Sequence, residues 1–158
     1  MYANRRQIRL SSPQDTCGLA QKIAPRLTPG DTILLAGGVG AGKTHFARCA
    51  IQAVLDVPED VPSPTFTLIQ VYDTKVGEIW HTDLYRLNQT SELDELGLSQ
   101  AFTDAICFVE WPDRLVDEAP YSALSLSLDA SGGDDTRVAT MEWNTARWTT
   151  LLREALDD

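Results

Sequence analysis

The sequence predicts an α/β fold in three layers, with helices on both faces of a mixed, mainly parallel central sheet. In the first half of the chain, helices alternate with strands, a pattern that favours parallel pairing. In the second half, short strands follow one another and are expected to pair as hairpins. The chain has 158 residues, the length of one domain, so we expect a single domain over residues 1–158.

Turn and capping residues delimit the elements of the first half. Ser12 is expected to cap a helix, with Pro13 in its first turn and Asp15 as the acid of a capping box. Pro25 should end or kink that helix. Around it we expect, in chain order, a strand at 7–10, a turn at 28–31, an apolar strand at 32–36 and a helix at 44–55.

The second half supplies further strands. Residues 67–73 and 78–83 should form a hairpin, and 105–110 is a continuous apolar run typical of a strand buried on both faces. Between them, residues 91–102 are expected to be partly helical, with Gly97 weakening the helix. After them we expect an alternating strand at 124–128, a turn at 131–135, a strand at 137–143 and a helix from Asn144.

The charge of the chain is uneven. It has 13 basic and 23 acidic residues, a net charge of −10. Residues 1–50 include seven basic and two acidic residues, whereas residues 51–158 include six basic and 21 acidic residues. An acidic chain repels a phosphate backbone, so we expect no DNA binding. We also expect no direct RNA binding, except through the basic residues of 1–50.

The sequence predicts a cytoplasmic protein without a membrane anchor. Its longest apolar runs are far shorter than the roughly 20 residues of a membrane span, and its first residues lack the apolar core of a signal peptide. The cysteines Cys17, Cys49 and Cys107 form an odd, widely spaced set. This spacing favours reduced thiols over a disulfide framework or a zinc site.

A glycine-rich loop at residues 37–44, GGVGAGKT, matches the phosphate-binding pattern G-x-x-x-x-G-K-[ST] and lies between an apolar strand and a helix. Loop N–H groups and the helix N-terminus attract phosphate, Lys43 neutralises it, and the Thr44 hydroxyl can bind Mg²⁺. The motif predicts a P-loop NTPase-like fold. The expected nucleotide-binding residues of this segment are Gly38, Val39, Gly40, Ala41, Gly42, Lys43, Thr44 and His45.

A carboxylate at the end of a neighbouring strand should complete a magnesium site. Glu110 fits, because it ends the apolar strand at 105–110. Asp83 ends another strand and is expected either to position water or the metal, or to serve as a turn or cap residue. His81 is expected to be a half-buried strand histidine, since two histidines are too few for a metal cluster.

The sequence favours ATP over GTP as the nucleotide. It has no N-K-x-D segment of the kind that guanine-specific switch proteins use. The segment at 94–97 formally matches D-x-x-G, but it lies in a helical stretch rather than after a strand.

Five segments together resemble the TsaE (YjeE) family. They are AGKT at 41–44, SPTFT at 63–67, HTDLYR at 81–86, ELDELGL at 92–98 and EWP at 110–112, in the order and spacing of that family. The family is the bacterial ATPase component of the machinery that makes threonylcarbamoyladenosine in tRNA. The resemblance covers residues 34–112.

The resemblance implies a role for each matching residue. Lys43 and the loop would hold the phosphates of ATP, with Thr44 and Glu110 on Mg²⁺. Thr65 would lie in a switch-like loop that senses the γ-phosphate, and Asp83 would be an extra acid near the metal. Trp111 would lie beside the nucleotide, although an aromatic after a central strand is more often core packing. The catalytic residues so implied are Lys43, Thr65, Asp83 and Glu110.

Two positions depart from the family pattern. Gly38 stands where the family usually has an acid, and His45 stands where it commonly has threonine or another small polar residue. Neither position supplies a group that phosphate binding needs, but Gly38 should make the loop more flexible.

The function favoured by the sequence is ATP hydrolysis as a regulatory step. The resemblance implies weak activity alone and stimulation by TsaB–TsaD, the complex that transfers threonylcarbamoyl to tRNA and through which tRNA would be reached. The arginine finger stays open among Arg5, Arg6, Arg48 and Arg86. Two alternatives are a small metabolite kinase, which the scattered arginines after residue 50 disfavour, and a binding module that does not hydrolyse ATP.

Overall fold

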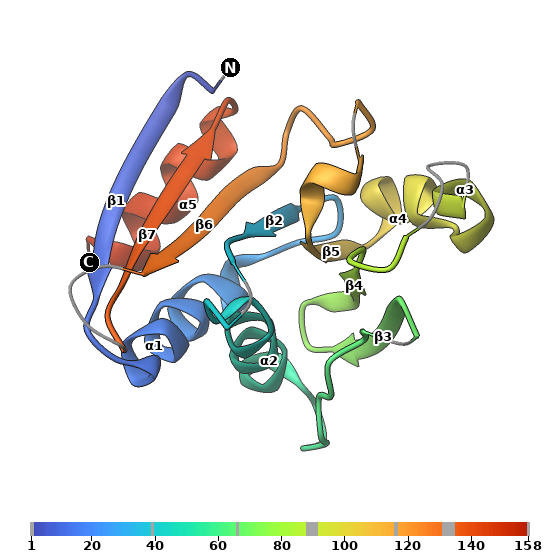
Figure 1. Cartoon of the computed structure of the whole chain (residues 1–158), viewed down its shortest axis with the longest axis horizontal. Coiled ribbons are helices and arrows are strands. Elements are labelled where there is room, and N and C mark those ends of the chain that lie inside the picture. Colours follow the sequence, from blue (N-terminus) through green and yellow to red (C-terminus); the bar gives the residue numbers. More distant parts are fainter. Residues whose placement is uncertain are drawn as a thin grey trace.

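Seven strands in the described part of the chain form one mixed sheet (Figure 1). The structure is a computed structural model, and it describes residues 2–38, 40–65, 67–87, 92–115, 117–130 and 135–157. The strands are β1 (Asn4–Leu10), β2 (Thr32–Ala36), β3 (Ile69–Thr74), β4 (Gly77–Asp83), β5 (Ile106–Glu110), β6 (Leu124–Ala130) and β7 (Arg137–Trp143). The helices are α1 (Pro13–Ile23), α2 (Lys43–Val54), α3 (Glu92–Leu96), α4 (Leu98–Asp104) and α5 (Ala146–Leu156), with 3₁₀ turns η1 (Ala24–Arg26) and η2 (Pro112–Leu115).

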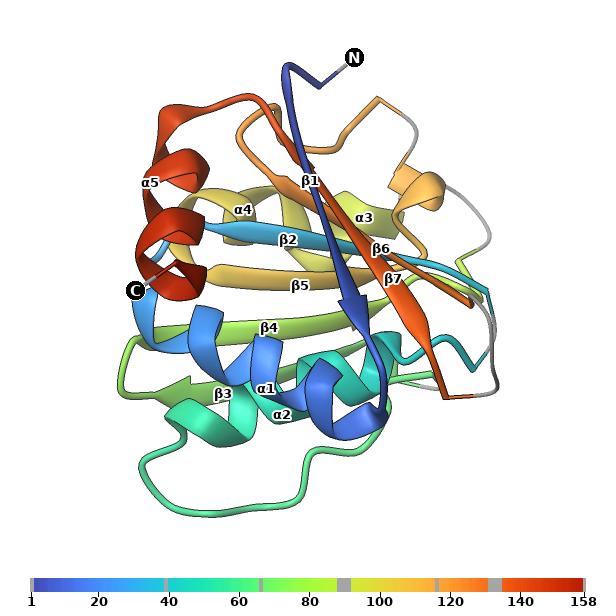
Figure 2. The same ribbon diagram turned by 90° about the vertical axis from the view of Figure 1, so that its left-hand side faces the viewer.

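The strands follow the order β1-β7-β6-β2-β5-β4-β3 across the sheet. Strands β6, β2, β5 and β4 form a parallel centre, while the pairs β1–β7, β6–β7 and β3–β4 are antiparallel. Figure 2 shows β1 and β7 inclined steeply to β2 and β5, as the twist of a sheet requires. The predicted mixed sheet is confirmed, with its parallel part in the core and antiparallel pairs at both edges.

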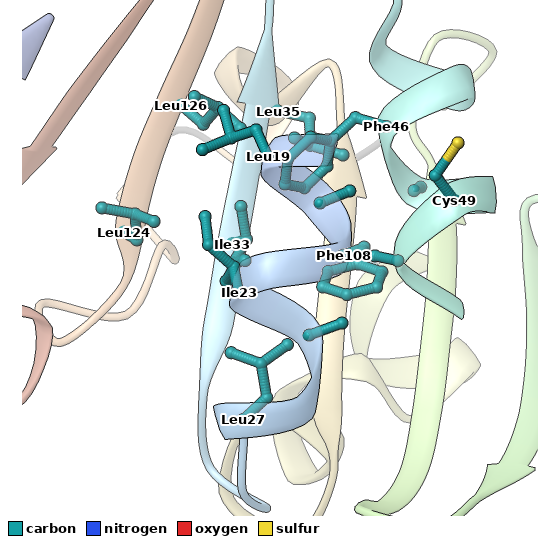
Figure 3. Packing of buried hydrophobic residues seen from close by; sticks show 14 of the residues in the cluster. Leu19, Ile23, Leu27, Ile33, Leu35, Phe46, Cys49, Phe108, Leu124 and Leu126 are labelled. Atoms are coloured by element: carbon teal, nitrogen blue, oxygen red, sulfur yellow. The ribbon is translucent and has the colours of Figure 1, made fainter. Parts of the chain in front are cut away.

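Helices cover both faces of this sheet, which gives the three predicted layers. On one face, α1, α2 and α5 pack over a core that includes Ile33 and Phe108, and Figure 3 shows side chains from α1, α2, β2, β5 and β6 converging there. On the opposite face, α4 and η2 pack over a second cluster that includes Leu34 and Val109. Successive residues of a strand point to opposite faces, so a central strand covered on both sides is apolar throughout.

Most predicted elements are confirmed, with ends that shift by a few residues. Ser12 caps α1 by accepting the backbone N–H of Asp15 at 3.2 Å. The helix ends before Pro25, which lies in η1. Gly97 adopts a φ of +81° between α3 and α4, so the expected partial helix consists of two short helices.

The C-terminal third differs from the elements predicted from the sequence at two points. Helix α5 begins at Ala146 with Thr145 as its N-cap, rather than at Asn144. The turn expected at 131–135 falls mainly on residues 131–134, which lie outside the described residues, as does residue 91. Within the described part of the chain, every helix is too short or too polar to cross a lipid bilayer.

The cysteines contradict the prediction. Cys17 on α1 and Cys49 on α2 form a disulfide, with Cα atoms 5.3 Å apart, whereas Cys107 in β5 is free and buried. The expectation of three reduced thiols is therefore wrong. The two bonded cysteines lie 32 residues apart in the sequence, and that spacing does not reveal that α1 and α2 pack side by side.

Candidate functional site

A cavity of about 480 Å³ opens at the carboxyl ends of β2, β4 and β5. In open α/β sheets, ligands bind outside this edge, where loops leave the parallel strands. The lining residues come from segments far apart in the sequence and are Gly40, Ala41, Gly42, Lys43, Thr44, His45, Ser63, Thr65, Asp83, Tyr85, Glu110 and Trp111. The fold therefore gathers most of the polar residues singled out above into one cavity.

All but two of the residues predicted for nucleotide binding line this cavity. Gly38 lies in the same loop beside them, and Val39 lies outside the described residues. The residues predicted to be catalytic line it as a group: Lys43, Thr65, Asp83 and Glu110.

The glycine-rich loop turns sharply between β2 and α2. At Gly37 the backbone φ is +136°, and a Cβ would lie 2.5 Å from the carbonyl oxygen of Leu128 in β6. Gly42 is the N-cap of α2 with a φ of +109°, a conformation that side chains disfavour. Helix α2 therefore begins at Lys43 with its unpaired N–H groups and positive dipole end at the cavity, where an anion is stabilised.

The Lys43 side chain is buried and folds back onto its own loop. Its Nζ donates to the carbonyl oxygens of Gly37 at 2.7 Å and Gly38 at 2.8 Å, and lies 4.2 Å from the ring centroid of Trp111. Burial lowers the pKa of Lys43, while the nearby carboxylate of Glu110 opposes that shift. The ammonium group of Lys43 is thus held by neutral carbonyl oxygens, which are weak acceptors. The charged oxygens of a phosphate are stronger acceptors and could take their place.

The Glu110 carboxylate is the hub of a buried hydrogen-bond network. The Thr44 hydroxyl donates to it at 2.8 Å, and the Nε2–H of His81 donates to its Oε2 at 2.7 Å. Glu110 is only 2% exposed and His81 is fully buried, so the alternative of a surface acid is wrong for Glu110. The prediction of a half-buried His81 is also wrong, because β4 lies inside the sheet between β3 and β5.

A second carboxylate, Asp83, is bound to different groups. The Thr65 hydroxyl donates to its Oδ2 at a long 3.3 Å, and the backbone N–H of Tyr85 donates to its Oδ1 at 2.9 Å. The hydroxyls of Thr65 and Ser63 are 2.6 Å apart. Asp83 therefore caps the turn after β4, as one of the two predicted alternatives has it, and it also lines the cavity.

Trp111 follows β5 and lies at the cavity wall. Its φ of +59° is rare for a residue with a large side chain, and its ring packs against Tyr85 with centroids 4.9 Å apart. The same side chain packs against the second hydrophobic cluster. Trp111 therefore combines core packing with a position beside Lys43.

Sequence reasoning missed Arg137, the first residue of β7. Its guanidinium donates to the carbonyl oxygens of Gly40 at 3.2 Å and Ala41 at 3.3 Å, so it braces the glycine-rich loop. The candidate Arg48 instead donates to the carbonyl of Val61 at 2.8 Å. Arg137 lies nearly a hundred residues beyond the loop, and no local pattern marks it.

The donor set of the cavity fits a nucleotide and a magnesium ion. A lysine and the positive end of a helix suit phosphate, while a hydroxyl and two carboxylates are the oxygen ligands that Mg²⁺ takes. A glycine-rich loop between a central parallel strand and a helix, with these groups around it, defines a P-loop NTPase-like nucleotide-binding protein.

The chain belongs to the TsaE family. The family model described as "Threonylcarbamoyl adenosine biosynthesis protein TsaE" matches residues 10–144. The TsaE protein of Rickettsia bellii is 34% identical over 132 residues, which is 84% of this chain and 91% of the relative. That of Bacillus subtilis is 34% identical over 131 residues, 82% of this chain and 81% of the relative. The crystal structure of YdiB from Bacillus subtilis superposes with a TM-score of 0.79 and 29% identity, covering 98% of this chain and 95% of that one.

Proposed function

We propose that this chain, as a single P-loop domain, binds ATP with Mg²⁺ and hydrolyses it in the biosynthesis of threonylcarbamoyladenosine in tRNA. Its relatives are named tRNA threonylcarbamoyladenosine biosynthesis proteins. The observation that carries the ATPase proposal is the 2.8 Å hydrogen bond between Thr44 and Glu110. It joins the phosphate-binding loop to a buried carboxylate at the end of a neighbouring strand, which is the arrangement that a bound magnesium ion requires.

Lys43 and the start of α2 hold the phosphates in this proposal. The Nζ atom of Lys43 donates to two neutral carbonyls of its own loop, and charged phosphate oxygens are better acceptors than carbonyls. The ring of Trp111, 4.2 Å away, limits how far the lysine moves when it changes partners.

Thr44 and Glu110 hold Mg²⁺ through a hydroxyl and a carboxylate oxygen. When bound, the ion supplies positive charge that stabilises phosphoryl transfer. His81 keeps the Glu110 carboxylate in one orientation through a fully buried 2.7 Å hydrogen bond. It is a positioning residue, because it contacts Glu110 rather than the reacting atoms.

Thr65 would contact the γ-phosphate in this proposal, and Asp83 would orient the attacking water. The 3.3 Å bond between them is weak, so Thr65 can exchange it for a γ-phosphate oxygen at little cost. Asp83 is then free to accept a hydrogen bond from water and orient it for attack. The backbone N–H of Tyr85 fixes the other oxygen of this carboxylate.

Partner stimulation fits the composition of the cavity. Among the described residues that line it, the only side-chain cation of the Lys/Arg type is Lys43. An arginine that stabilises the charge of the transition state is worth several orders of magnitude in turnover. We therefore propose weak ATPase activity alone and stimulation on the TsaB–TsaD complex, with tRNA contacted through those partners.

The test is ATP affinity in a matched pair of variants. Lys43→Ala should weaken ATP binding by about 10-fold or more, as expected for a lost hydrogen bond between charged groups. Lys22→Ala, an equivalent change at an exposed position of α1, should leave the affinity unchanged. Equal affinity of Lys43→Ala and the unmodified chain, measured by titration calorimetry, would remove the foundation of the proposal.

A further inference from the structure

Two sulfurs and an imidazole meet beside the nucleotide cavity, and the proposed ATPase uses neither sulfur. Cys17 lies on α1, and His45 and Cys49 lie one turn apart on α2, with all three functional atoms within 4.8 Å of one another. The Cα atoms of the bonded cysteines are 5.3 Å apart, within the range that an ordinary disulfide spans. The two thiols of the reduced chain therefore meet without a change in the helix packing.

The disulfide encloses the phosphate-binding loop. The covalent ring that it closes runs from Cys17 to Cys49, a separation of 32 residues, and contains β2 and the whole loop at 37–44. Cys49 lies in the middle of α2, the helix that begins at Lys43, so the bond ties this helix to α1. Opening the bond removes this covalent restraint and leaves the segment held by packing and by hydrogen bonds, among them those from Arg137 to the loop.

His45 connects this disulfide to the cavity. Its side chain lines the cavity and donates its Nε2–H to the carbonyl oxygen of Pro13 at 2.9 Å. The same nitrogen lies 3.9 Å from the sulfur of Cys49. One half-buried side chain thus contacts the start of α1, the disulfide and the wall of the nucleotide site.

The exposure of the cysteine residues indicates which sulfur a small thiol reaches first. Cys17 is partly exposed, whereas Cys49 is 7% exposed and Cys107 is fully buried. Burial also raises the pKa of Cys107 to about 12, which keeps that thiol protonated and inert. Thiol exchange therefore begins at Cys17.

We propose that Cys17 and Cys49 form a reversible thiol–disulfide site that sets the nucleotide affinity of the loop it encloses, with small-molecule thiols and disulfides as its reactants. In reduction, a small thiolate attacks the sulfur of Cys17, the protein disulfide breaks, and Cys49 leaves as a thiolate that takes up a proton. A second small thiolate attacks the small-molecule sulfur of the mixed disulfide, which releases Cys17 and a small disulfide. Oxidation by a small disulfide is the reverse sequence.

The oxidised chain should bind ATP more tightly. The disulfide restricts the loop before the nucleotide arrives, so less conformational freedom is lost on binding. This inference rests on the proposed ATP binding, and thiol counting tests the site itself independently of ATP.

The first measurement counts free thiols. The full chain is equilibrated in buffers of reduced and oxidised glutathione, and free thiols are counted after denaturation. One free thiol, that of Cys107, is expected under oxidising conditions and all three under reducing conditions. Three free thiols at every glutathione ratio would overturn the inference.

The second measurement compares ATP affinities. The oxidised chain should have a Kd about threefold or more below that of the reduced chain. Cys17→Ser, and as a second variant Cys49→Ala, should have the Kd of the reduced chain in both buffers, whereas the control Cys107→Ala should keep the difference. Equal Kd values for the two forms would overturn this inference alone, while absence of ATP binding in both forms would overturn the proposed function.

Discussion

Asp83 and Glu110 lie directly opposite each other in the parallel register of β4 and β5. Each is the last residue of its strand, so the register places two carboxylates side by side at the edge of the sheet where the glycine-rich loop also lies. Their partners differ, because Glu110 binds Thr44 and His81 whereas Asp83 binds Thr65. These different partners support the separate roles proposed above, in which Glu110 holds the metal and Asp83 acts beside Thr65.

Glu110→Gln should lower Mg²⁺-dependent ATP turnover by about 100-fold, because it removes a charged ligand without changing the size of the side chain. ATP binding measured without Mg²⁺ should change little. The assay is phosphate release at saturating ATP and Mg²⁺. Glu118→Gln, the same change at an exposed position, serves as the control.

Glu110→Gln also tests whether the protein acts by hydrolysing ATP or only by binding it. A chain with Glu110→Gln that still supports formation of the modified nucleoside at the normal rate would mean that hydrolysis is dispensable. The protein would then be a binding module that ATP merely orders.

His81→Leu should destabilise the fold and weaken magnesium binding together. The change leaves a buried carboxylate without one of its donors, which costs about 2–4 kcal/mol in the free energy of unfolding. His81→Gln, whose amide can donate the same hydrogen bond, should recover part of that loss. Urea unfolding and the Mg²⁺ concentration for half-maximal turnover are the two measurements. If both stay unchanged in His81→Leu, the positioning role is wrong.

Arg137→Ala should weaken ATP binding by about three- to tenfold, the effect of losing hydrogen bonds that brace the loop. The guanidinium contacts the carbonyls of Gly40 and Ala41 rather than the space for the phosphates, so the effect comes through loop order. Arg153→Ala, an exposed change on α5, should have no effect. If calorimetry finds the same Kd for ATP in Arg137→Ala as in the unmodified chain, the hydrogen bonds from Arg137 to the loop do not contribute to ATP binding.

The ion pair between Arg6 and Asp157 joins β1 to the end of α5, with an N–O distance of 2.6 Å. The hydrogen bond from Arg6 lowers the pKa of Asp157 below its ordinary value of 3.8. A carboxyl whose pKa is lower in the folded chain stabilises the fold above the pH at which it ionises in the unfolded chain. That contribution is lost as the pH falls through the folded-state pKa.

Arg6→Gln should therefore raise the pKa of Asp157 toward 3.8. The measurement is an NMR titration of the Asp157 side-chain carboxyl in both chains. A midpoint that does not move would mean that the ion pair does not form in solution.

The glycine-rich loop and the position of Glu110 at the end of a buried strand were predictable because their signals are local. Residues 37–44 carry a contiguous motif, and Glu110 ends an apolar run that identifies a buried strand. The layers followed from the alternation of elements. These features depend on neighbours in the sequence, which a single chain displays directly.

Contacts between distant segments were not predictable in the same way. The disulfide of Cys17 with Cys49 depends on how two helices pack, and the brace by Arg137 depends on a strand at the far end of the chain. The burial of His81 depends on the order of strands in the sheet. Each of these is decided by tertiary structure, on which residue spacing carries no information.

We propose that this chain hydrolyses ATP at the glycine-rich loop and does so effectively only with its partners. The most direct test is the rate of phosphate release from ATP and Mg²⁺, measured with and without purified TsaB–TsaD, for the unmodified chain and for Lys43→Ala. We predict slow release alone, at least a severalfold increase with the complex, and loss of that increase in Lys43→Ala. A rate that TsaB–TsaD does not change, together with failure of the chain to bind the complex, would contradict the account.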